Sequence, residues 1–229
     1  MLVQIKNSPP GVRAFPFLVF VLLTAVQGKL GASSAYWVYV LKTFLGLGLF
    51  FWMRSAIKEM RWTLNGASLL TGVAIFGLWV GLDGHYPTLS QLTARWFPSS
   101  PQPTWNPFAQ FGDGSLIAWF VVVVRILGTA YVVPPIEEAL YRSLMYRSIA
   151  RPDFENQPLS RFSAKAFILT SVIFGLMHPD QWLAGILCGL AYQALVLRCG
   201  HLGEAMAAHG VTNCLLGCWV VWKGAWHFW

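Results

Sequence analysis

Long apolar runs separated by short polar stretches make up most of the chain. A helix needs about 20 mostly apolar residues to cross a bilayer core of about 30 Å. Runs that approach or reach this length lie at 14–28, 35–53, 64–82, 115–133, 163–179, 181–198 and 203–222. We therefore expect an all-α polytopic membrane protein with about seven or eight transmembrane helices.

The composition supports this fold class. Hydrophobic residues make up 56% of the 229 residues and charged residues only 11%, whereas soluble domains carry about 25% charge. Such a chain is not a disordered segment, a collagen or a disulfide-stapled secreted domain.

The basic residues predict an orientation. With the N-terminus in the cytoplasm, 11 of the 16 Lys and Arg residues fall on the inner side, 3 fall outside and 2 lie within spans. This distribution agrees with the positive-inside rule. Because the basic residues lie between apolar runs and not in one patch, the net charge of +7 reflects membrane topology, and we expect lipid and not nucleic acid as the partner.

The polar stretch 83–114 is rich in Pro, Ser and Trp and is predicted to be an irregular connector on the outer side, with a lid as the alternative. No internal repeat interrupts the chain. We expect a single transmembrane domain over 1–229, in which 1–114 supplies additional N-terminal helices and this loop. The aromatic end, VVWKGAWHFW, is typical of an interface anchor.

Ionisable groups inside apolar segments are expensive in a membrane and usually have a function. Pro134 and Pro135 predict a kinked or broken helix, with Glu137 and Glu138 in the first turn of the new helix, where the helix dipole favours carboxylates. Glu138 and Arg142 are spaced to pair at i and i+4, which leaves Glu137 as the carboxylate that can react with water. A Glu-Arg pair is also common on ordinary amphipathic helices.

Two further pairs of polar and aromatic residues follow. Phe174 and His178 lie four apart, and Pro179 is a natural helix stop, although a single histidine at a helix end is more often a cap than a catalyst. His209 and Asn213 also lie four apart, among small residues that permit close helix packing. If Glu137 and His178 are to reach one water, the segment 115–150 must form one long or broken helix.

The order Glu-Glu-x-x-x-Arg, Phe-x-x-x-His and His-x-x-x-Asn over about 115–222 resembles the CAAX-processing and bacteriocin-immunity (CPBP/Abi) family of intramembrane proteases, which includes the Ras-converting CAAX endopeptidases. The resemblance implies a glutamate-dependent endopeptidase in which Glu137 and His178 activate water. It also implies that His209 and Asn213 hold the oxyanion and that Glu138 and Arg142 support Glu137. Residues 1–114 resemble no family.

The resemblance also frames the alternatives. No cofactor and no metal ligand is assigned, because the chain lacks a His-Glu-x-x-His helix, although a zinc-dependent version stays open. The expected partner is a peptide or protein substrate, including one with a lipidated or processed C-terminus, at a prokaryotic cytoplasmic membrane. The competing interpretations are a non-enzymatic immunity or partner-binding protein and a transporter, which would more often show internal repeats.

Other polar residues have less specific interpretations. Arg125, Tyr141 and Phe174 are candidate substrate-binding residues, and Arg125 is equally compatible with a structural pair. Lys42 has a structural interpretation. We expect the histidines to lie in loops or at the terminus, namely His85, His201 and His227. We expect the cysteines to be small residues that fill space, namely Cys188, Cys199, Cys214 and Cys218.

Overall fold

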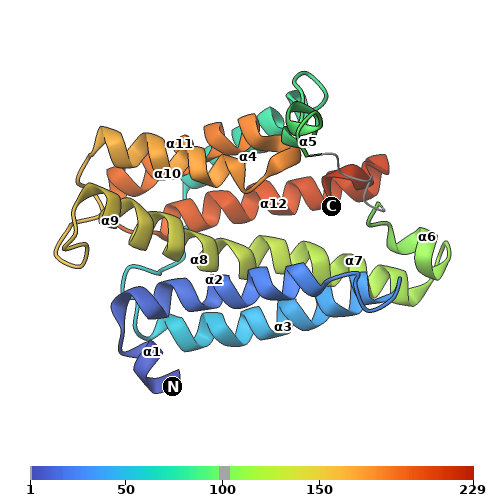
Figure 1. Ribbon diagram of the computed structural model, residues 1–229, viewed down its shortest axis with the longest axis horizontal. Coiled ribbons are helices and arrows are strands. Elements are labelled where there is room, and N and C mark those ends of the chain that lie inside the picture. The colour runs from blue at the N-terminus through green and yellow to red at the C-terminus, as the bar shows by residue number, and fades with distance from the viewer. Residues whose placement is uncertain (1, 98–103) are drawn as a thin grey trace. The chain divides into compact units, whose positions relative to one another are not determined.

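The computed structural model describes residues 2–97 and 104–229, and within these ranges the chain is helical without β-strands (Figure 1). The longer helices are α2 (Pro9–Val26), α3 (Ser34–Arg54), α4 (Gly66–Gly81), α7 (Leu116–Leu127), α10 (Ala164–Leu176), α11 (Trp182–Cys199) and α12 (Gly203–Lys223). The shorter α-helices are α1 (Leu2–Lys6), α5 (Leu89–Thr93), α6 (Pro107–Phe111), α8 (Val133–Glu138) and α9 (Tyr146–Ala150). Two π-helical segments, η1 (Gly128–Val132) and η2 (Ala139–Met145), and two 3₁₀ turns, η3 (Pro179–Gln181) and η4 (Trp226–Phe228), complete the order.

All seven predicted apolar runs form helices, but they are not equally long. Five helical segments in the described residues have the length and hydropathy of a membrane span, namely 9–26, 34–54, 116–150, 179–199 and 203–223. The helices α4 and α10 have 16 and 13 residues, or about 24 and 20 Å, which is short of a bilayer core. The predicted count of seven or eight spans is therefore not confirmed.

Local signals explain why these two helices are short. The side chain of Asn65 accepts from the Ser68 amide, and the Ser68 hydroxyl accepts from the Asn65 amide. This capping box starts α4 at Gly66. Ser163 caps α10 through the Ala166 amide, and Pro179, which cannot donate, follows closely after its end.

Large apolar side chains cover the outside of the spans. Leu22, Phe44, Leu70, Leu127 and Trp222 are each at least half exposed. A soluble protein would not leave so many large apolar side chains in water. Together with the lengths of the helices, this surface makes the chain an integral membrane protein.

The chain forms two compact units. Unit 1 contains the described parts of Met1–Lys58, Thr104–Leu140 and Asn213–Trp229, and unit 2 those of Glu59–Pro103 and Tyr141–Thr212. Residues 98–103, at the centre of the predicted 83–114 loop, lie outside the described residues.

In unit 1, α3 packs against α2 and α7. Small residues allow this approach, because a Cβ on Gly128 would lie 2.8 Å from the Thr43 hydroxyl. An aromatic cluster of Tyr36, Tyr39 and Trp105 ties the 104–111 segment to α3. The Trp105 indole donates to the Ala35 carbonyl at 3.1 Å, so this part of the predicted connector is fixed.

In unit 2, α10 and α11 form a closely packed pair, and α4 packs on α11. A Cβ on Gly175 would lie 2.6 Å from the Trp182 carbonyl, and a Cβ on Gly189 would lie 2.9 Å from the Ser171 Cα. The backbones therefore approach as closely as glycine allows, as is usual for helices in lipid.

The segment 116–150 is helical throughout, as the sequence predicts for a long helix. It is not broken at Pro134 and Pro135. The π-helical segment η1 directly precedes the prolines, and in it the Val133 amide donates to the Gly128 carbonyl five residues back. Because proline collides with the carbonyl four residues before it, the wider turn is what lets the helix continue through these residues.

Candidate active site

Glu137 and Glu138 lie at the end of α8, inside the continuous helix 116–150. The prediction that they occupy the first turn of a new helix is therefore wrong, because the helix does not restart at the prolines. A helix dipole can favour an ionised carboxylate only near a free N-terminus. It does not act on these two residues.

Glu137 is half buried, and its Oε2 atom is buried without a hydrogen-bond partner among the described residues. Its charge interacts with that of Lys42 in the same unit. Lys42 donates to Thr24 and Gln27 at 3.0 and 3.3 Å, which supports its structural interpretation. A buried carboxylate oxygen without a fixed donor is available to bind water or a substrate proton.

Glu138 and Arg142 are completely buried. Between them begins the π-helical segment η2, which widens the helix at this point. Glu138 belongs to unit 1 and Arg142 to unit 2. Their predicted pairing stays a prediction.

Phe174 is the centre of an aromatic group in unit 2. The Arg142 guanidinium lies 4.6 Å from the centre of its ring, and Tyr141 meets the ring edge-on at 5.1 Å. The rings of His178 and His209 lie 4.9 and 6.1 Å from it. The structure thus brings four of the predicted site residues together around a fifth, the buried Phe174.

His178 follows the end of α10 and has one fixed ring nitrogen. Its Nδ1 lies 2.9 Å from the Phe174 carbonyl oxygen, and because a carbonyl only accepts, Nδ1 carries the proton. Nε2 is then the basic nitrogen. Trp79 packs edge-on against the ring at 5.5 Å, so the imidazole is held from two sides.

His209 is 5% exposed and stacks on Tyr192 at 5.2 Å with an interplanar angle of 26°. The Tyr192 hydroxyl donates to Thr212 at 2.7 Å, and the Thr212 hydroxyl lies 2.9 Å from the Gly72 carbonyl. This chain of polar contacts fixes the ring on which His209 stacks.

Asn213 lies in unit 1, where its Nδ2 donates to the Thr129 carbonyl at 2.8 Å. Thr129 lies five residues before Pro134, in the π-helical segment. A residue with an N–H at position 134 would supply a π-type donor to this carbonyl, but proline has none. Asn213 replaces that donor, and one of its two N–H groups stays available.

Arg125, predicted as a substrate-binding candidate, lies among aromatic rings in unit 1. Its guanidinium lies 4.7 Å from Tyr39, 4.1 Å from Trp105 and 5.1 Å from Trp229, measured to the ring centres. Its Nε is buried without a hydrogen-bond partner in the described part of the chain. Three cation–π contacts favour the structural interpretation.

The turn after His178 is held by residues that the sequence analysis did not single out. Gln181 donates to Asp83 at 2.6 Å and accepts from the Tyr86 hydroxyl at 3.0 Å. Burial raises the pKa of the Tyr86 phenol, so it stays a neutral donor at physiological pH. The 83–86 part of the predicted loop is therefore an ordered support for this turn.

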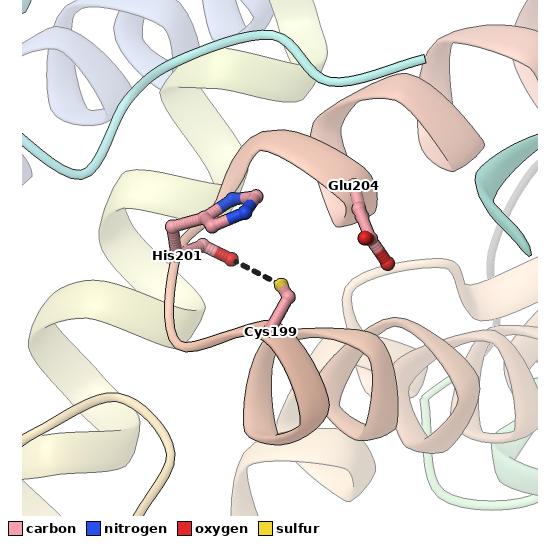
Figure 2. A group of neighbouring side chains, drawn as sticks. All are labelled: Cys199, His201 and Glu204. Carbon is pink, nitrogen blue, oxygen red and sulfur yellow. Dashed lines mark hydrogen bonds between the residues drawn. The ribbon is translucent and has the colours of Figure 1, made fainter. Parts of the chain in front are cut away.

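A second cluster of polar side chains lies in unit 2 at the turn between α11 and α12. It contains Cys199, His201 and Glu204, whose donor atoms all lie within 4.8 Å of one another (Figure 2). None of the four cysteines, all of which lie in the described residues, forms a disulfide, and only Cys188 is buried, whereas Cys218 is exposed. The space-filling interpretation of the cysteines therefore holds for Cys188 alone.

The helices and the chain's apolar surface define a multi-pass integral membrane protein. Residues 116–215 match the family described as Type II CAAX prenyl endopeptidase Rce1-like. Over this segment the chain is similar to the CAAX-protease family, which supports the resemblance that the sequence motifs indicate. No curated protein and no solved structure matches the chain.

Proposed function

We propose that the chain is a CAAX-protease-like endopeptidase that hydrolyses a peptide bond near the membrane, with a water activated by Glu137 and His178. The observation that carries the proposal is the state of the His178 ring. Its Nδ1 proton is engaged by the Phe174 carbonyl, which leaves Nε2 as the nitrogen that can accept a proton. The family match supports the endopeptidase reaction.

The chemistry needs two proton transfers. Water attacks the scissile carbonyl carbon as its proton passes to Glu137 or His178, and the C–N bond then breaks as the same proton is given to the leaving amine. His209 and the second N–H of Asn213 donate to the oxyanion of the tetrahedral intermediate. Glu138 and Arg142 support Glu137, and no metal takes part.

The proposed substrate is a membrane-associated peptide or protein with a lipidated or processed C-terminus. Tyr141 and Phe174 are 2% and 1% exposed. We therefore propose that they form the buried wall of the site and hold Arg142 in position. Arg125 is retained as a substrate-binding candidate. We propose a prokaryotic cytoplasmic membrane as the location. The N-terminus lies on its cytoplasmic side, as the distribution of basic residues favours.

The test is hydrolysis of a membrane-anchored reporter peptide by the purified chain in detergent. Wild type should cleave it, and Glu137→Gln and His178→Ala should each lower kcat by about 10²- to 10⁴-fold, the usual contribution of a general base. Thermal unfolding should confirm that both variants are folded.

Glu155→Gln and His227→Ala are the matched controls, because both residues lie outside the proposed site and Glu155 is exposed. Both controls should keep full activity. Equal turnover of wild type, Glu137→Gln and His178→Ala would contradict the mechanism. A folded wild type that cleaves no peptide would favour the partner-binding alternative.

A further inference from the structure

The turn between α11 and α12 brings three donor types together. Gly200 has a φ of +72°, a left-handed conformation that reverses the chain within four residues. It places the Cys199 sulfur, the His201 imidazole and the Glu204 carboxylate beside one another (Figure 2). None of the three belongs to the proposed catalytic group.

We propose that Cys199, His201 and Glu204 form a binding site for a divalent transition metal, with Zn²⁺ as the preferred ion. Thiolate, imidazole and carboxylate are the ligands that Zn²⁺ takes in proteins, at about 2.0–2.3 Å. Tetrahedral bonds of that length separate the ligand atoms by about 3.3–3.8 Å. Donors that already lie within 4.8 Å need only small side-chain rotations to close around the ion.

Two of the ligands are already oriented. Glu204 is 6% exposed, and its Oε1 accepts from the Asn65 amide at 2.8 Å. The His201 Nδ1 accepts from the Gly203 amide at 3.1 Å, so Nδ1 is the unprotonated nitrogen, and a metal bound there would take over the lone pair that now accepts this hydrogen bond. Asn65 would stay as the outer partner that holds the carboxylate, which is a usual feature of metal sites.

The third ligand is accessible. Cys199 is partly exposed, and its thiol donates to the His201 carbonyl at 3.1 Å. Metal binding replaces this weak hydrogen bond by a metal–sulfur bond and releases the thiol proton to solvent. Three protein ligands leave a fourth position for water.

In this structure Arg198 supplies the positive charge beside the Glu204 carboxylate. Its guanidinium pairs with Oε2 of Glu204, and its side chain is 57% exposed. An exposed arginine can move into solvent at little free-energy cost. The metal and Arg198 therefore compete for the same carboxylate oxygen, which makes Arg198 a diagnostic position.

The metal site uses none of the residues of the proposed catalytic group. Glu204 lies in the first turn of α12, and His209 follows five residues later, about 7.5 Å along the same helix. A bound ion would fix the start of the helix that carries His209. The inference does not depend on the proposed function, because metal binding is measurable without hydrolysis.

The experiment is a titration of the full chain, purified with a chelator and then freed of it, with Co²⁺ alone. Wild type should bind one equivalent and show thiolate-to-cobalt charge-transfer absorption, which Zn²⁺ should abolish. Cys199→Ser should remove the band, and His201→Ala should weaken Co²⁺ binding at least tenfold. Cys218→Ser and His227→Ala should bind as wild type does.

A further variant keeps the test decisive if Cys199→Ser fails to fold. Arg198→Met removes the competing cation and should tighten Co²⁺ binding several-fold, an effect that a purely structural ion pair would not produce. Wild type without charge-transfer absorption, or Arg198→Met with unchanged or weaker binding, would overturn the proposal.

Discussion

At the scale of single residues, Asn213 has a structural contact in addition to the catalytic role that we propose for it. Its position four residues after His209 predicts a polar group for the reaction. The structure shows that its side chain also satisfies the Thr129 carbonyl, in the turn widened ahead of the prolines. The same contact that completes the helix therefore fixes the direction of the amide.

Replacing Asn213 by Ala should separate the structural contact from the proposed catalytic role. The Thr129 carbonyl would lose its donor, which should lower the free energy of unfolding by about 1–3 kcal/mol. Loss of an oxyanion donor should lower kcat by about 10²- to 10³-fold. Denaturation and hydrolysis should be measured together, with the exposed Asn156→Ala as the control. A loss of stability with unchanged kcat would leave Asn213 a structural residue only.

At this scale, sequence reasoning selects candidate residues but does not predict the residues that surround them. The glutamates, histidines and Arg142 stand out because charge is rare in apolar segments. The contacts of Trp79, Thr129 and Gln181 arise from residues distant in the sequence, which no local pattern contains. Of these three residues, only Thr129 is marked in the sequence. Pro134 lies five residues after it and has no N–H, so in a π-helical turn the Thr129 carbonyl has no backbone donor.

At the scale of elements, the widened turn η1 and the prolines that follow it work together. A proline inside a helix costs about 3 kcal/mol, and here the helix continues through two of them. One extra residue in a turn rotates everything that follows by about 100°. The turn thus sets the direction in which Glu137 points.

Pro134→Ala should therefore raise stability and lower activity. A restored N–H can donate to the backbone and return the segment to a regular α-helix, which would rotate Glu137 away from its present direction. We expect an unchanged or higher unfolding temperature and a kcat about a hundredfold lower, since small misplacements have effects of that size.

Pro16→Ala is the matched control for this variant, because Pro16 is also a buried proline inside a helix, in α2. It should raise stability without changing kcat. Full activity of Pro134→Ala would show that the π-helical turn does not orient the glutamate.

Apolar runs in the sequence predict the helices but not where each helix begins and ends. All seven apolar runs become helices, because apolar length is a local property. Their boundaries depend on capping residues such as Asn65 and Ser163, so α4 and α10 are shorter than their runs. The π-helical segments depend on packing and on the prolines, and hydropathy does not predict them.

At the scale of the whole molecule, the arrangement of charge predicts which loops face which compartment. Asn156 and Asp113 are both exposed in connectors that lie at opposite ends of the helix 116–150. The positive-inside rule places Asn156 in the cytoplasm and Asp113 outside.

Labelling of introduced cysteines checks this orientation. In intact cells a membrane-impermeant maleimide should label Asp113→Cys, whereas it should label Asn156→Cys only after permeabilisation. Unmodified protein gives the background from the native thiols. The reverse pattern would invert the proposed topology.

The length of the helix 116–150 has a consequence for how a substrate arrives. Its 35 residues extend over about 50 Å, whereas the apolar core of a bilayer is about 30 Å thick. If Leu116 lies at one surface, about 20 residues cross that core and Glu137 lies near the opposite surface. A scissile bond can then reach it from the aqueous side of the membrane, and a thicker bilayer would submerge the glutamate, so lipid chain length should set the rate of turnover.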